Sequence, residues 1–207
     1  MKKKADFDYF RLFSAISQAE SIAAHELTNI AEEYAITRID RCKCRVNEQK
    51  NKVNERKNQI IMSLWQDFLP PMNRGDLVEY TQKLGEAGIL LSKVVTMMEM
   101  YPVPYLKGDI KNAVQAIEEA MKVNEQIIRE LPNYKKSKVL GKNICCCRKW
   151  IDEGVAAYHH SLRQVTRHAE VTKDFFSWIR IYDSINEVLC CLKDMIDLTE
   201  RMIYRNL

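Results

Sequence analysis

Residues that break helices are rare in this sequence and are confined to a few places. The 207 residues include six glycines and five prolines, and the prolines form three clusters: Pro70 with Pro71, Pro102 with Pro104, and Pro132 alone. An all-β fold needs turn residues roughly every eight to twelve positions, and this chain lacks them. The long stretches between the clusters contain nothing that would end a helix. We therefore expect an all-α fold.

Apolar residues recur at steps of three and four along six segments, which places them on one face of a helix. The spacing predicts helices over residues 10–34, 36–68, 77–101, 110–131, 144–165 and 175–206. The stripe from Leu77 to Tyr101 is the most regular, because it repeats in heptads until the break at Pro102. Short connections between the six segments favour an elongated antiparallel bundle.

The segment from Pro102 to Gly108 divides the predicted bundle into two parts with three helices each. We expect one domain over residues 1–207, with a first half at about 5–101 and a second half at about 109–206. With 46% hydrophobic residues, the chain can bury a sizeable core.

The charge and cysteine patterns favour a soluble cytoplasmic protein. The formal charge of +4 is too small to indicate nucleic-acid binding. No apolar run is long enough to span a membrane, and the lysines at positions 2–4 lead into charged sequence rather than a signal core. The seven cysteines are an odd number and lie close together in sequence, as Cys42 with Cys44, residues 145–147, and Cys190 with Cys191. This pattern suits a reducing compartment better than a disulfide framework.

The sequence holds no recognisable catalytic or metal-binding spacing. A di-iron bundle needs a glutamate three positions before a histidine, and no histidine has one. The four histidines are His25, His159, His160 and His168. Cys42 and Cys44 form the only short cysteine pair with a spacer, which is too little for a structural zinc site. The run of cysteines at 145–147 is interpreted as small apolar filler on a buried helix face. We expect neither enzymatic activity nor a cofactor.

A basic connector joins the fourth and fifth predicted helices over residues 134–142. It contains Lys135, Lys136, Lys138 and Lys142, and Arg148 and Lys149 follow it. These side chains are able to contact phosphate groups or anionic lipid, and an ordinary solvated surface is the alternative.

Two stretches resemble the PhoU-like family, in the branch of unknown function that accompanies low-affinity (Pit) phosphate transporters. They are LWQDFLPPMNRGDLVEYTQKL at residues 64–84 and YDSINEVLCCLKDMIDLTERMIYRN at residues 182–206. In that family a helix ends in Phe-Ile-Thr-Pro and the next begins with Arg-Glu-Asp-Ile. Residues 68–71 and 74–77 match these motifs, and the aromatic start at residues 9–13 also fits.

The resemblance implies two three-helix bundles and a non-enzymatic accessory or regulator of phosphate transport. The implied partner is a protein, either the cytoplasmic face of a phosphate transporter or a sensor. Contact with the membrane would then occur only through the transporter.

The family holds metal clusters with Glu-x-x-x-Asp on one helix and Asp-Asp-x-x-Asp on the next, in each half. Carried over to this chain, these ligands fall on Lys50, Asn54, Gly85, Glu86 and Ile89, and then on Arg148, Asp152, Asn186 and Cys190. Of the acids at these positions, Glu86 and Asp152 survive. The resemblance therefore implies that the metal sites are lost, because hard cations require clustered oxygen ligands.

In each half one former acid is a cation, Lys50 in the first and Arg148 in the second. Arg148 and Asp152 are four residues apart, a spacing that favours a helical ion pair. We expect Arg148 to hold Asp152 close to Asn186 and Cys190, in place of the metal. The alternative is that Lys50 and Arg148 form ordinary surface salt bridges.

Two other functions remain open from the residues alone. One is a metal-binding bundle with cysteine ligands, Cys190 together with residues 145–147. The other is a self-associating structural module that buries its heptad faces in a homodimer.

Overall fold

The computed structural model describes residues 7–167 and 173–206. Its elements are α1 (Tyr9–Glu32), α2 (Ile36–Gln66), α3 (Arg74–Met100), α4 (Ile110–Glu130), the 3-10 turn η1 (Leu131–Asn133), α5 (Leu140–Arg167) and α6 (Lys173–Asn206). Within these two ranges there is no strand. The lysines at positions 2–4 and His168 lie outside the described residues. The prediction of an all-α protein is confirmed.

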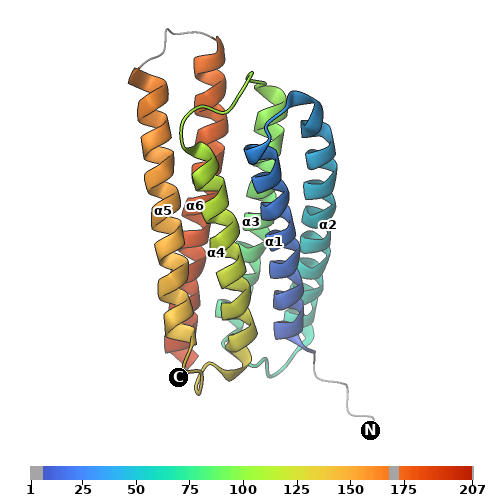
Figure 1. Ribbon diagram of the computed structural model, residues 1–207. Helices are drawn as coiled ribbons and strands as arrows, with labels where there is room; N and C mark the ends of the chain where they lie inside the picture. The colour runs from blue at the N-terminus through green and yellow to red at the C-terminus, as the bar shows by residue number, and fades with distance from the viewer. Residues whose placement is uncertain (1–6, 168–172, 207) are drawn as a thin grey trace.

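The six helices form an elongated antiparallel bundle (Figure 1). In the first half α2 packs against α1 and α3, and in the second half α5 packs against α4 and α6. The halves meet where α1 contacts α4 and α3 contacts α6. The predicted arrangement as two groups of three helices is confirmed.

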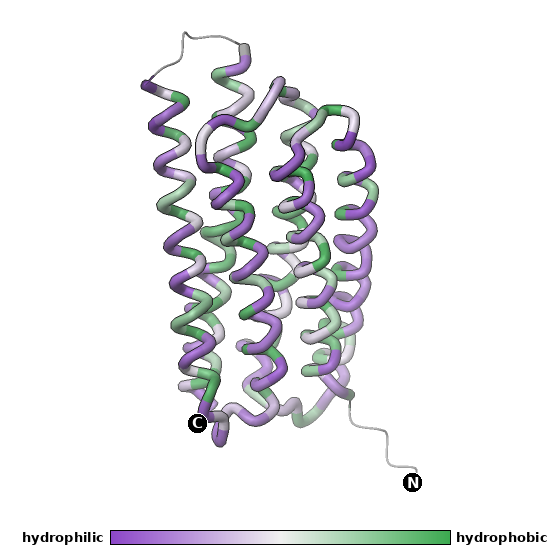
Figure 2. Tube along the Cα trace, in the orientation of Figure 1, coloured by the Kyte–Doolittle hydropathy of each residue, from purple (hydrophilic) through white to green (hydrophobic). Residues whose placement is uncertain are grey.

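The apolar stripes supply the core. On α3 the predicted stripe is fully buried at Leu77, Tyr80, Leu84, Ala87, Leu91, Val94 and Met98. Only its last member, Tyr101 at the C-cap, is half-buried. Hydrophobic and hydrophilic residues alternate along every helix in Figure 2, as expected when each helix turns one face to the core.

Several helix boundaries differ from the sequence prediction by one to four residues, and local hydrogen bonds explain two of them. α2 ends at Gln66 rather than at residue 68, and Arg74 donates hydrogen bonds to the carbonyl oxygens of Leu64 and Asp67 where the helix ends. α5 begins at Leu140 rather than near residue 144, because the Ser137 hydroxyl accepts a hydrogen bond from the Leu140 amide at 3.3 Å. The last part of the basic connector is therefore helical.

The start of α1, the α2–α3 loop, the α4–α5 connector and the end of α6 lie together at the lower end of the bundle in Figure 1. Side-chain contacts link them. Tyr9 donates to Asp67 Oδ2 at 2.9 Å, and Asn206 accepts from the Asn73 amide at 3.0 Å. The crossover between the halves lies at the upper end. Over the described ranges, no helix has the combination of length and apolar character needed to cross a membrane.

Candidate functional site

The first group of predicted site residues lies where α2 and α3 face each other. A methyl group added at Gly88 would lie 3.2 Å from the Val53 side chain, and one added at Gly85 would lie 2.4 Å from Cδ of Lys57. The two helices are antiparallel, so these contacts fix their register. Asn54 therefore lies close to the level of Gly88. The structure thus places Lys50, Asn54 and Gly85 along one α2–α3 seam.

The chemistry of this seam is cationic and amide-rich. Lys50 Nζ donates to Ser92 Oγ at 3.3 Å, and Ser92 Oγ donates to Asn47 Oδ1 at 2.7 Å. The aliphatic stem of Lys57 covers the buried backbone of Gly85. Lysine stems commonly cover apolar surface in this way while the ammonium group stays near water.

The surviving acid of the first half does not join this network. Glu86 is exposed and forms an ion pair with Lys83 at 2.8 Å, and Lys83 also lies 3.4 Å from Asp194 on α6. Ile89 is 46% exposed. Glu86 and Ile89 therefore contribute to the surface of α3 rather than to a shared cluster with α2.

In the second half, Arg148 reaches across from α5 to α6. Its guanidinium lies 2.7 Å from Asp197 and 2.5 Å from Glu200. The predicted pair with Asp152 is wrong, because the guanidinium bonds these two carboxylates on α6 and Asp152 remains exposed. The four-residue spacing would allow Arg148 to pair with Asp152 within α5. However, α6 packs beside α5 and brings the carboxylates of Asp197 and Glu200 within reach of the guanidinium.

The other predicted residues of the second half lie elsewhere on α6. Asn186 is half-buried and Cys190 is exposed. Near them Tyr158 of α5 donates to Asp183 Oδ1 at 2.9 Å. Burial, together with this hydrogen bond and the negative charge of Asp183, raises the pKa of Tyr158 to about 12. Tyr158 is therefore a neutral donor at physiological pH.

No protein-family model and no curated protein sequence matches the chain. Among solved structures it is similar to a PhoU-like protein from Shewanella oneidensis MR-1, with a TM-score of 0.80 and 14% identity over 95% of this chain and 99% of that chain. A PhoU-like phosphate regulatory protein from the same organism matches with a TM-score of 0.74 and 12% identity over 96% and 100%. The chain has a PhoU-like fold. The resemblance inferred from its sequence motifs is confirmed at the level of the fold.

The residues of this chain do not fit the metal clusters of the family that its sequence resembles. Divalent cations such as Mg²⁺ or Mn²⁺ take oxygen ligands. The α2–α3 seam instead presents the ammonium groups of Lys50 and Lys57, and the α5–α6 seam presents the guanidinium of Arg148. In the part of the chain that the structure describes, no group of three or more His, Cys, Asp or Glu residues is placed to hold a metal ion.

The cysteines divide into buried and exposed residues, all of them free. Cys147 is buried and its thiol donates to the carbonyl oxygen of Ala120 at 3.3 Å. Burial raises the pKa of Cys147 to about 12, which disfavours the thiolate that a metal would need. Cys145 and Cys146 are exposed, so the expectation of a buried run is wrong for two of its three members. Adjacent helical residues point about 100° apart, and only one of the three can face the core.

The buried acid Glu20 is not among the residues predicted from the sequence. Its side chain is 1% exposed, and neither carboxylate oxygen has a hydrogen-bond partner among the described residues. Burial raises the pKa of Glu20 well above its usual value, and the nearby backbone of Gly88 opposes this only in part. A sequence signal for its position existed, because Glu20 lies seven residues after Phe13 and seven before Leu27, on the same buried stripe.

We expect Arg148→Ala to lower the free energy of unfolding by about 0.5–1 kcal/mol, because the three side chains of its ion-pair network are partly exposed. Double-mutant cycles in denaturant melts should show coupling of Arg148 with Glu200 and none with Asp152. Lys149→Ala is the matched control, since the Lys149 side chain is 78% exposed. Stronger coupling with Asp152 than with Glu200 would contradict this pairing.

Proposed function

We propose that this PhoU-like chain is a cytoplasmic, non-enzymatic accessory or regulator of inorganic phosphate transport. It acts by binding a partner protein, either the cytoplasmic face of a phosphate transporter or a sensor. The observation that carries the proposal is the match over nearly the whole chain to two PhoU-like structures, one of them a phosphate regulatory protein. The motifs at residues 68–71 and 74–77 add independent support from the sequence.

The chemistry of the two seams supports action through protein contact. Positions that hold metal ligands in the family carry Lys50 in the first half and Arg148 in the second, and each bonds neighbouring side chains. Fixed cations replace carboxylates there, so regulation by this chain does not require a bound divalent ion.

The test is phosphate uptake by cells whose only phosphate carrier is a Pit-type transporter, measured with and without this chain. A regulator whose coupling energy is at the low end of the usual range changes uptake roughly fivefold. The tagged chain should also retain the transporter after detergent extraction of the membranes.

The matched control is the same strain with an ATP-driven phosphate transporter in place of the Pit-type carrier, in which uptake should not change. Unchanged uptake in the first strain, together with no retention of its transporter, would show the proposal to be wrong.

A further inference from the structure

Four large apolar side chains are exposed together where α2 ends. Met62 is 53% exposed, Trp65 74%, Phe68 89% and Leu69 81%. We call these four residues the apolar tip. Met62 and Trp65 are three residues apart near the C-terminus of α2, and Phe68 and Leu69 follow in the loop. A soluble monomer exposes single apolar residues often, but a contiguous group of this kind marks an interaction surface.

Hydrogen bonds to the backbone anchor the segment that carries the apolar tip. Arg74 Nη1 donates to the Leu64 carbonyl oxygen at 2.6 Å. Asp67 accepts from Tyr9 through Oδ2 at 2.9 Å and from the Leu69 amide through Oδ1 at 3.3 Å. Pro70 and Pro71 then restrict the chain that follows. The apolar side chains are therefore held outward on a fixed backbone, which reduces the entropy lost on binding.

A groove runs from the tip toward the start of α1. It has a volume of about 900 Å³ and a mixed lining, in which Phe7, Phe10, Met62 and Leu69 lie beside polar residues such as Asp8 and Asp67. The groove therefore adds some apolar side chains next to the tip.

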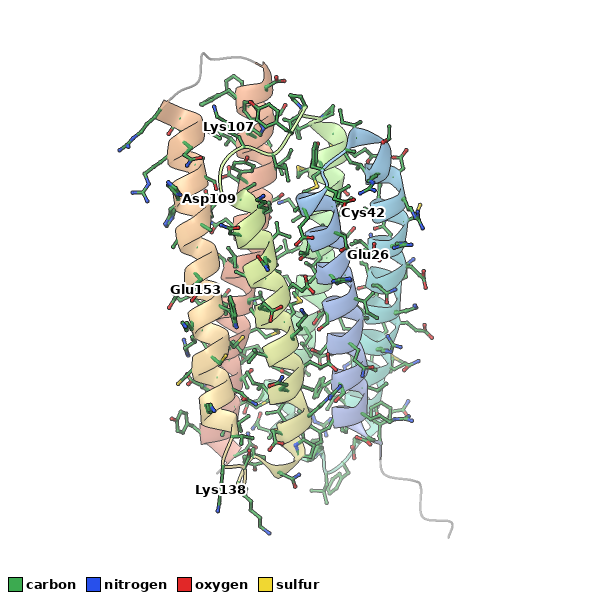
Figure 3. All side chains as sticks on the ribbon, viewed as in Figure 1. Glu26, Cys42, Lys107, Asp109, Lys138 and Glu153 are labelled. Carbon is green, nitrogen blue, oxygen red and sulfur yellow. The ribbon has the colours of Figure 1, made fainter. Side chains whose placement is uncertain are left out.

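The basic connector lies at the same end of the bundle. Asn206, at the end of α6, accepts from the Asn73 amide in the α2–α3 loop and from the Tyr134 hydroxyl in the connector. One residue therefore joins the two loops. Lys135, Lys136 and Lys138 are exposed beyond this junction, and Lys138 projects from the lower end in Figure 3.

Hydrogen bonds occupy the carboxylates of this end. Asp8, Asp67 and Glu130 accept from a backbone amide or a hydroxyl group and keep their charge, whereas Asp76 forms an ion pair with Arg205 at 2.8 Å. By contrast, none of the three connector lysines has a carboxylate partner within the described ranges. Their positive charge is therefore available to an external anion.

We propose that the lower end of this PhoU-like bundle binds an anionic lipid bilayer directly. The apolar tip enters the interfacial layer, where tryptophan and other apolar side chains are favoured, and the connector lysines contact lipid phosphates. Lysine is depleted in protein–protein interfaces but typical of surfaces that bind anionic lipid, which favours lipid over a protein as the occupant. The inference deepens the proposed function, because it places the chain beside a membrane transporter without requiring the transporter for attachment.

The test is flotation of the full chain with protein-free vesicles of phosphatidylcholine, with and without phosphatidylglycerol. The tip variant carries Trp65→Ser, Phe68→Ser and Leu69→Ser. Its matched control carries Ile36→Ser, Met100→Ser and Phe176→Ser, three side chains that are 53–59% exposed at the opposite end.

The charge variant carries Lys135→Gln, Lys136→Gln and Lys138→Gln. Its control carries the same change at Lys111, Lys149 and Lys193, which are exposed on the helices. Circular dichroism verifies that each variant is folded.

We expect the wild-type chain to bind vesicles that contain phosphatidylglycerol, and added salt should weaken this binding. Loss of the tip should reduce affinity roughly tenfold or more. Loss of the three lysines should reduce it roughly a hundredfold, at about fivefold for each lysine. Both control variants should bind like the wild type.

Absence of wild-type binding to the anionic vesicles would overturn the proposal, as would equal losses in the tip variant and its control. A tip variant that binds vesicles normally but no longer retains the transporter would show that the tip binds protein instead. Failure of the proposed function is separate, because it would leave vesicle binding intact while phosphate uptake did not respond to the chain.

Discussion

Replacement of Glu20 by methionine should stabilise the protein by about 2–4 kcal/mol at pH 8, an unusual direction for a core substitution. Glu20 is 1% exposed on α1, and both of its carboxylate oxygens lack hydrogen-bond partners among the described residues. A buried polar group without a partner costs free energy, and a buried charge costs more. Methionine has a similar volume and no group that requires a hydrogen bond, so it should fill the site without strain.

The pH dependence distinguishes the cost of ionisation from the cost of burying a polar group. Because burial raises the pKa of Glu20 in the folded state, the folded protein keeps this proton above pH 4.5 while the unfolded chain releases it. The free energy of unfolding therefore falls as the pH rises, by up to about 1.4 kcal/mol per pH unit, until the pH passes the folded-state pKa. Below pH 4.5 the contribution of Glu20 no longer depends on pH.

Glu20→Gln is the matched control, since it removes the ionisation and keeps the polar group. Near pH 4 this variant should resemble the wild type, and at pH 8 it should be more stable. The methionine variant should exceed both at either pH. Urea melts from pH 4 to 9 provide the measurement, and parallel curves for the wild type and Glu20→Gln would show that folding does not raise the pKa of Glu20.

Gly108→Ala should destabilise the protein by about 2–4 kcal/mol. Gly108 lies in the crossover between the two halves, where its φ is +73°. A residue with a side chain is strained there. Its Cβ would also lie 2.6 Å from Gln164 Oε1 and 3.3 Å from the backbone Cα of Ser161 on α5. Gln164 is able to move aside, but the α5 backbone is not.

The crossover has little freedom to relax around an added methyl group. Trp178 Nε1 donates to the Tyr105 carbonyl oxygen at 2.8 Å, and the Lys107 amide donates to the Tyr182 hydroxyl at 2.7 Å. Gly141→Ala is the matched control, because a methyl group there meets no atom within 4 Å. In the first turn of α5 it should be neutral or stabilise by up to about 1 kcal/mol. Equal thermal unfolding temperatures for the two variants would contradict this account of Gly108.

Local signals in the sequence are enough to specify the class of fold. Pro70, Pro102 and Pro132 limit where helices can end, and the three-and-four spacing on the segment 77–101 specifies which face is buried. Two boundaries differ because the end of α2 depends on a hydrogen bond that Arg74 donates and the start of α5 on one that Ser137 accepts, and neither bond is visible in a periodic pattern.

Which charged groups meet depends on how the helices pack against one another. Arg148 has a carboxylate at helical spacing in Asp152, yet it bonds Asp197 and Glu200, because a long side chain reaches the neighbouring helix as easily as its own next turn. Sequence spacing describes neighbours within one helix and says nothing about the register of the helix packed beside it.

Burial and exposure at particular positions were decided in the same way. Glu20 is enclosed because α1 contacts α2, α3 and α4, and a helix surrounded on several sides buries more than one stripe. Trp65 lies in the last turn of α2 and Phe68 in the loop after it, and both are exposed because none of the described helices covers them. Local patterns specify each helix and its preferred face, whereas the packing of distant helices determines what covers that face.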